Sequence, residues 1–245
     1  MQLAYELEPG TRVQLGMIVL QADETLEGDF RRLLPEEANL LVSRVPSGDD
    51  LTTETLRAME AHLTTAAGLL PRGATFQAVG YGCTSGAAEI GAARVEELVR
   101  AGVETPEVTN PVSALVAACR HLGLDRIGVI SPYVASVSDR LRSVLLEAGI
   151  ETTEFASFEE PVEANVVRIS EASIMAAAVE MGQRGSCDAI FLSCTNLRTL
   201  GVISRIEDAI GKPVLASNPV LAWHICRLAG VRTAQGAPGA LFKAG

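Results

Sequence analysis

The sequence predicts an α/β protein built from two pseudo-symmetric subdomains, each a parallel sheet flanked by helices. Short apolar runs alternate with helical patterns of roughly 10–20 residues along the 245-residue chain, and this alternation is typical of βαβ units and parallel sheets. In addition, several short motifs of the first half recur in the second half, shifted by a nearly constant number of positions. The first observation predicts the fold class, and the second predicts the two similar halves.

The expected strands are short apolar runs with β-branched residues. The first run, VQLGMIVL, does not alternate between apolar and polar residues, which is typical of parallel strands covered on both faces. Seven runs are expected to be strands: residues 13–20, 38–45, 75–81, 126–130, 152–155, 189–193 and 213–216.

The expected helices lie between these strands. They carry the apolar spacing of a helix with one buried face, and Ala, Val, Leu and Gly fill most of their apolar positions. Six stretches are expected to be helices: residues 50–70, 86–101, 112–122, 136–148, 170–184 and 220–229.

An internal repeat predicts where the two halves meet. The tripeptide NPV at 110–112 recurs at 218–220, which is 108 positions later, and the dipeptide CT at 83–84 recurs at 194–195, which is 111 positions later. Each CT follows an apolar strand and precedes a helical stretch. Ligands of open parallel sheets bind at the carboxyl ends of the strands. We therefore expect both CT turns to face one cleft.

The repeat also leads to an expected division of the chain. A first α/β subdomain comprises residues 1–115 plus 217–245 and carries Cys83, and a second comprises residues 116–216 and carries Cys194. Apolar helix faces on the outside of such subdomains permit a homo-oligomer, but nothing in the sequence requires one.

Cys83 and Cys194 are the candidate catalytic residues. Glycines and hydroxyl residues surround Cys83 in GYGCTSG, so the thiol is expected beside a helix N-terminus, where free N–H groups favour a thiolate and bind a carboxylate. Cys194 repeats this design in FLSCTNL. The alternative is that either residue is a buried structural thiol. A facing pair of thiols suits proton transfer on opposite faces of one carbon centre.

Composition excludes several other functions. The net charge is −10, and no cluster of Lys and Arg exceeds two adjacent residues, so nucleic acid is a poor partner. No run reaches the roughly 18 uncharged apolar residues that span a bilayer, and the N-terminus lacks the pattern of a secretion signal. Five cysteines without regular spacing predict a reducing cytoplasm rather than a disulfide framework. No histidine lies close in sequence to Cys83 or Cys194, so no metal site is expected.

The motifs GCTSG and SCTN, the turn SPYV at 131–134 and the stretch SNP…AWH at 217–224 resemble the aspartate/glutamate racemase superfamily. Within it the chain is most similar to the branch of maleate cis-trans isomerases and arylmalonate decarboxylases. The resemblance implies two α/β subdomains with the site between them and chemistry without a cofactor. Decarboxylases of this branch typically keep only the second cysteine, whereas this chain has both, as isomerases and racemases do.

The resemblance also implies a set of substrate-binding residues. They are expected to donate hydrogen bonds to a small carboxylate substrate: Thr84, Ser85, Tyr133, Asn165, Thr195 and Asn196. The alternative for Tyr133 is a packed tyrosine with a solvated hydroxyl group, and the assignment of Asn165 depends on a weak alignment.

Asp23 departs from the pattern of similar isomerases, which have an asparagine for the substrate carboxylate at this place. A carboxylate there would repel such a substrate, and more strongly when it is desolvated. Asp23 is therefore expected to stay protonated, to point away, or to meet a substrate ammonium group. A further alternative is that it caps a helix beginning near Glu24.

Three functions follow as hypotheses. The leading one is a cis-trans isomerase of a small dicarboxylate, of the maleate-to-fumarate type, in which Cys83 adds to the alkene and Cys194 moves the proton. The second is an amino-acid racemase that exchanges a Cα proton; Asp23 favours it, and ADET at 22–25 resembles ectoine-utilisation members of the superfamily. The third is a small-molecule-binding protein with inert cysteines.

Overall fold

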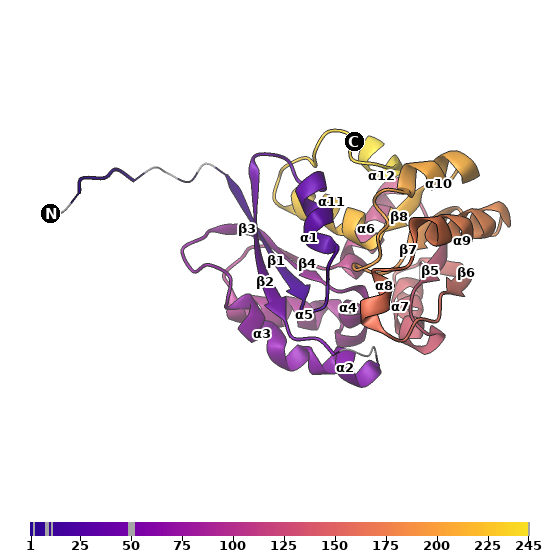
Figure 1. The fold of residues 1–245 in the computed structure, drawn as a ribbon, viewed down its shortest axis with the longest axis horizontal. Coiled ribbons are helices and arrows are strands. Elements are labelled where there is room, and N and C mark those ends of the chain that lie inside the picture. The colour runs from indigo at the N-terminus through magenta and orange to yellow at the C-terminus, as the bar shows by residue number, and fades with distance from the viewer. Residues whose placement is uncertain (2, 8–9, 11, 49–51, 245) are drawn as a thin grey trace.

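Two parallel sheets of equal strand order form the centre of the molecule in the computed structural model, which describes residues 1, 3–7, 10, 12–48 and 52–244 (Figure 1). The first sheet has the order β2-β1-β3-β4 and the second the order β6-β5-β7-β8, and every recorded strand pair is parallel. The strands are β1 (Val13–Leu20), β2 (Ala38–Val45), β3 (Phe76–Gly82), β4 (Val108–Thr109), β5 (Arg126–Ser131), β6 (Glu151–Ser157), β7 (Ala189–Leu192) and β8 (Val214–Ala216). The α/β class and the two similar halves are confirmed.

Helices cover both sheets. They are α1 (Leu26–Leu33), α2 (Thr53–Ala58), α3 (Glu60–Ala67), α4 (Thr84–Ile90), α5 (Ala92–Gly102), α6 (Pro111–Leu122), α7 (Ala135–Glu147), α8 (Glu163–Val166), α9 (Glu171–Gln183), α10 (Ile203–Ile210), α11 (Ser217–Leu228) and α12 (Ala240–Lys243). Among the described residues, none of these helices combines the length and apolarity needed to cross a membrane.

Two expected helices are each divided in the structure. The stretch expected at 86–101 is α4 followed by α5, because Gly91 between them has φ 92°, a conformation outside the helical region that glycine adopts without strain. The stretch expected at 50–70 is α2 followed by α3, with Met59 between them. Residues 50 and 51 of that stretch lie outside the described residues.

Five elements among the described residues have no counterpart in the sequence prediction: α1, β4, α8, α10 and α12. The strand β4 has only two residues, and the helix α10 lies where no periodic pattern was recognised. The helix α1 begins close to Glu24, where a helix start was considered as an alternative for Asp23. Short elements carry too few residues for a period to be seen in the sequence.

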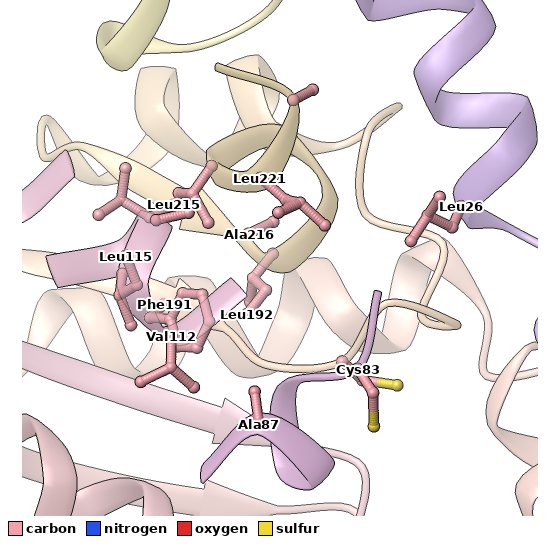
Figure 2. Close-up of a cluster of buried hydrophobic side chains, with 14 of the residues drawn as sticks. Leu26, Cys83, Ala87, Val112, Leu115, Phe191, Leu192, Leu215, Ala216 and Leu221 are labelled. Atoms are coloured by element: carbon pink, nitrogen blue, oxygen red, sulfur yellow. The ribbon is translucent and has the colours of Figure 1, made fainter. Parts of the chain in front are cut away.

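Helices α6 and α11 join the two halves. Helix α11 follows the second sheet but packs against α1, β3 and α6, all of which come earlier in the chain. Figure 2 shows Val112 and Leu115 of α6 beside Phe191 of β7, so a helix of the first half packs on a strand of the second. The expected boundary after residue 115 falls within α6, and the division into subdomains stays a prediction.

Strand register brings the candidate loops to the same sheet edges. Val19 near the end of β1 pairs with Gly82 at the end of β3, so the turns after these strands, with Asp23 and Cys83, are neighbours. In the second sheet Ile130 pairs with Leu192, which places the turns after β5 and β7 side by side. The carboxyl ends of the central strands therefore carry Asp23, Cys83, Tyr133 and Cys194, while Glu163 and Ser217 follow the edge strands β6 and β8.

Candidate active site

Cys83 is held at the start of α4. It follows β3 in an extended conformation (φ −146°, ψ 118°), and its sulfur accepts a hydrogen bond from the backbone N–H of Gly86 at 3.2 Å. Gly86 is needed here because a Cβ added to it would lie 2.9 Å from this sulfur. Only 4 % of Cys83 is exposed. Local backbone geometry therefore fixes the position of the thiol.

Cys194 occupies the corresponding turn of the second half, but the helix expected directly after it is not found there, because α10 begins only at Ile203. Cys194 lies two residues after β7, and its sulfur accepts a hydrogen bond from the backbone N–H of Asn196 at 3.2 Å. Its φ of 150° is rare for a residue with a side chain, and such conformations occur preferentially at functional sites. The residue is 4 % exposed, like Cys83.

Ser217, the first residue of α11, connects the two turns. Its Oγ accepts a hydrogen bond from the backbone N–H of Cys194 at 3.0 Å and lies 2.8 Å from Oγ1 of Thr84. A second connection runs from the hydroxyl of Thr195, which donates to the carbonyl of Gly82 at 3.3 Å. The two CT turns are thus bonded to each other, and both cysteines belong to one buried cluster.

Tyr133 links Cys194 to a carboxyl group. The tyrosine Oη lies 2.8 Å from the sulfur of Cys194 and donates a hydrogen bond to Oε2 of Glu163 at 3.0 Å. The amide nitrogen of Asn196 donates to Oε1 of Glu163 at 2.9 Å. Because the single hydroxyl proton of Tyr133 points to Glu163, the Cys194 thiol donates to the tyrosine oxygen. This chain can pass a proton from sulfur to carboxylate.

Glu163 was missed by the sequence analysis, and Asn165 was expected in its place. Asn165 is exposed and its amide donates to Oε1 of Glu160 at 3.3 Å, so the structure does not bring it to the cluster. Glu163 is 2 % exposed. In the four-residue helix α8, residue 163 points inward and residue 165 points outward, because residues that are two positions apart on a helix face different sides.

The two carboxyl oxygens of Asp23 have different surroundings. Its Oδ1 accepts hydrogen bonds from the backbone N–H groups of Thr25 and Leu26, each at 2.8 Å, and so caps α1. Its Oδ2 is buried and has no partner at hydrogen-bond distance among the described residues, because the nearby hydroxyl of Thr195 donates to the carbonyl of Gly82 instead. The residue is 4 % exposed. The capping alternative is therefore realised, but by one oxygen only.

The remaining expected residues lie in the same cluster. Thr84, Ser85, Thr195 and Asn196 are all buried. Asn196 also accepts a hydrogen bond from the backbone N–H of Glu24 at 2.9 Å, which ties the second CT turn to the loop after β1. Much of the hydrogen-bonding capacity of these side chains is used within the protein, so they position the turns as well as facing the site.

Burial determines the charge state of the ligand-free site. It raises the pKa of Cys83 to about 12, and the negative charge of Glu163 adds to this, while the N–H of Gly86 acts in the opposite direction. Burial also raises the pKa of Cys194 well above its usual value, and it raises the pKa values of Asp23 and Glu163. The expected thiolate at Cys83 is therefore not the resting form. Desolvation outweighs the N–H groups of the turn.

A hollow of about 10 Å³, lined by residues that include Leu20, Met59 and Glu163, adjoins the cluster. This is about the room that one water molecule needs. Among the described residues, no group of three or more His, Cys, Asp and Glu side chains is arranged to hold a metal ion.

Comparison with known proteins relates this arrangement to characterised enzymes. The family model described as "Arylmalonate decarboxylase" matches residues 15–242. The maleate isomerase of Alcaligenes faecalis is 25 % identical over 236 residues, which cover 90 % of this chain and 92 % of that protein. The resemblance expected from the motifs is thereby confirmed.

Solved structures share the fold. A crystal structure of a double mutant of arylmalonate decarboxylase in the liganded form has a TM-score of 0.84 and 27 % identity, covering 95 % of this chain and 100 % of that chain. A mutant of the Nocardia farcinica maleate cis-trans isomerase with a covalently bound succinylcysteine intermediate has a TM-score of 0.79 and 21 % identity, covering 95 % and 99 %. Both comparisons extend over nearly the whole chain and include both halves.

Proposed function

Because the chain belongs to the arylmalonate decarboxylase family of enzymes, we propose that it is a cofactor-independent isomerase of a small carboxylate, with Cys83 and Cys194 as the catalytic residues. The observation that carries the proposal is the pair of buried cysteines at equivalent turns of the two halves, joined through Ser217. Maleate isomerases among its relatives support an isomerase, and the retained first cysteine distinguishes it from the decarboxylase pattern.

The leading reaction is a cis-trans isomerisation of the maleate type. The Cys83 thiol gives its proton to one carboxylate of the substrate, its sulfur forms a bond to one alkene carbon, and the electron pair of the double bond moves toward the carboxylate on the other carbon. Cys194 gives its proton to that other carbon and the single bond rotates. Cys194 then takes a proton back while the carbon–sulfur bond breaks, and the Cys83 sulfur recovers its proton from the carboxylate. The succinylcysteine of the Nocardia farcinica enzyme is the adduct that this sequence of steps forms from maleate.

Ionisation of a buried thiol is the costly step, and two features lower its cost. The backbone N–H groups of Gly86 and Asn196 already donate to the two sulfurs and stabilise negative charge on them. Cys194 keeps its proton for the leading reaction; where it has to act as a base, the hydroxyl of Tyr133 can pass the thiol proton on to Glu163 without release to solvent.

A second candidate reaction is proton exchange at the Cα of an amino acid, with the same two thiols as bases on opposite faces. The buried carboxyl groups of Asp23 and Glu163 favour it, because they suit an ammonium group better than a second carboxylate. The chain Cys194–Tyr133–Glu163 also favours it, since a thiol that acts as a base first has to lose its own proton.

The experiment compares Cys83→Ala and Cys194→Ala with Cys119→Ala, which removes another buried thiol, on α6. Maleate turnover is followed by proton NMR, and Cα deuteration of aspartate and glutamate is followed in D₂O. Each of the first two substitutions should lower turnover by at least about 10²-fold, the lower end of what a positioned proton-transfer group contributes, while Cys119→Ala keeps it. Deuterium at Cα supports the second reaction, and maleate turnover without exchange supports the first. Unchanged turnover by Cys83→Ala contradicts both.

A further inference from the structure

We infer that Asp23 and Glu163 together form a binding subsite for a positively charged nitrogen of the substrate, so that the substrate class is a small carboxylate with an ammonium or amidinium group. The inference rests on the proposed function and specifies its substrate more closely. The relatives named maleate isomerase point only to a dicarboxylate without nitrogen.

The first observation is the free oxygen of Asp23. Capping of α1 uses only Oδ1, and an asparagine would cap a helix as well as an aspartate does. The cap therefore does not explain why the second oxygen of this carboxyl group is buried without a partner at hydrogen-bond distance. Buried polar atoms are nearly always paired, and such an exception calls for a ligand or another specific role.

The second observation is that Glu163 reaches the same place from the other half of the molecule. Its two oxygens accept hydrogen bonds from Tyr133 and Asn196, and it is almost fully buried. The amide nitrogen of Asn196 donates both to Oε1 of Glu163 at 2.9 Å and to the carbonyl of Ala22, the neighbour of Asp23, at 3.5 Å. The two carboxyl groups therefore face one another across this amide, and Tyr133 joins Glu163 to the thiol of Cys194.

No basic side chain of the described residues neutralises this pair. Arg44 acts on Asp23 electrostatically, but its guanidinium donates hydrogen bonds to the backbone carbonyls of Leu20, Gln21 and Asp23 and to the carboxylate of Glu27. It therefore holds the outer side of the loop. The charged and titratable groups around the pair are otherwise acids and thiols: Asp29, Cys83, Tyr133 and Cys194.

Charge balance then decides which substrate fits. A dicarboxylate meets two carboxyl groups that have to stay protonated, because like charges in a desolvated site repel. A cationic nitrogen instead displaces the protons and supplies the missing hydrogen-bond donors to Oδ2 of Asp23 and to Glu163. Binding of a cation should release protons and tighten as the pH rises, whereas binding of a dicarboxylate should weaken as the pH rises.

The test measures binding without turnover, by isothermal titration calorimetry at pH 6, 7 and 8 in buffers of different ionisation enthalpy. The probes are of similar size: succinate, both enantiomers of aspartate, and both enantiomers of 2,4-diaminobutyrate. We expect a nitrogen-bearing probe to bind at least tenfold more tightly than succinate, with proton release. In Asp23→Asn and in Glu163→Gln this preference should fall at least tenfold. In the control Glu159→Gln, which changes an exposed glutamate shortly before Glu163 in the chain, it should stay.

A ratio of two affinities in one variant does not depend on how much of that variant is folded. The inference is overturned if succinate binds as tightly as every nitrogen-bearing probe, if none of those probes binds, or if neither substitution changes the preference. Failure of the proposed function looks different, because Cys83→Ala would then keep its turnover whatever the binding preference is.

Discussion

Replacing Asp29 by asparagine should change how the stability of the protein depends on pH. Asp29 lies on α1, is 7 % exposed, and accepts a hydrogen bond at Oδ2 from the amide of Asn218 at 2.9 Å. The same amide donates to the carbonyl of Thr195 at 2.7 Å, so this carboxyl group adjoins the second CT turn. Burial raises the pKa of Asp29 from 3.8 to about 6.

The sign and size of the effect follow from this shift. A carboxyl group whose pKa is raised on folding contributes stability below its unfolded pKa of 3.8, and loses that contribution as the pH rises through about 6. One pKa unit corresponds to about 1.4 kcal/mol, so the whole contribution is about 3 kcal/mol, of which about 2 kcal/mol is lost between pH 4 and pH 7. Asn218 can still donate to the amide oxygen of an asparagine, so the variant lacks the titration and keeps the hydrogen bond.

Urea unfolding of wild type, Asp29→Asn and Asp139→Asn at pH 4, 5, 6 and 7 provides the measurement. The free energy of unfolding of wild type should fall relative to Asp29→Asn by about 2 kcal/mol across this range. Asp139 is exposed on α7 and serves as the control. The free energies of unfolding of Asp139→Asn and wild type should change in parallel with pH. A constant difference between wild type and Asp29→Asn from pH 4 to pH 7 would refute the assignment of a raised pKa to this group.

Two further predictions concern the turns themselves. Ser217→Ala removes the acceptor of the Cys194 N–H and the partner of the Thr84 hydroxyl; it should cost about 1–3 kcal/mol of stability and lower kcat, whereas Ser143→Ala, on an exposed face of α7, should do neither. Unchanged melting temperature and kcat for Ser217→Ala would contradict the bridging role. Because the pKa of Cys83 is about 12, about one molecule in 10⁴ carries its thiolate at pH 8. Its alkylation by iodoacetamide, followed by peptide mass spectrometry, should therefore rise about tenfold per pH unit from pH 7 to pH 10, and a plateau below pH 9 would show that the thiol is already ionised.

Much of the fold was predictable because it depends on buried apolar runs. The two strands 13–20 and 38–45 were predicted with their observed bounds, and the repeated CT and NPV motifs predicted two halves whose sheets have the same strand order. Motif repeats carry this information because each motif follows the end of a strand at the same place in its half. A helix begins directly at the CT of 83–84 and at both NPV motifs, whereas the CT of 194–195 is followed by turns as far as α10. The prediction that Cys83 and Cys194 lie in one cluster was based on that symmetry.

Side-chain direction in irregular segments was not predictable. Glu163 stands in an acidic stretch that looks like a solvated loop, and only the short turn of α8 makes it face the thiols while Asn165 faces solvent. The protonation state of the two thiols was not predictable either. A helix start predicts a stabilised thiolate, but the opposing desolvation depends on how tightly both halves close over the sulfurs, and this is a property of the packed molecule.

The order of the chain explains why both halves are needed for one site. Helix α11 begins directly after β8 of the second sheet and runs back over β3 and α1 of the first, so Ser217 at its start reaches both CT turns. The loop after β1 is in turn held by Asn196, and the two carboxyl groups of the cluster come from different halves. Either half alone would keep one thiol but would lose the partners that position it.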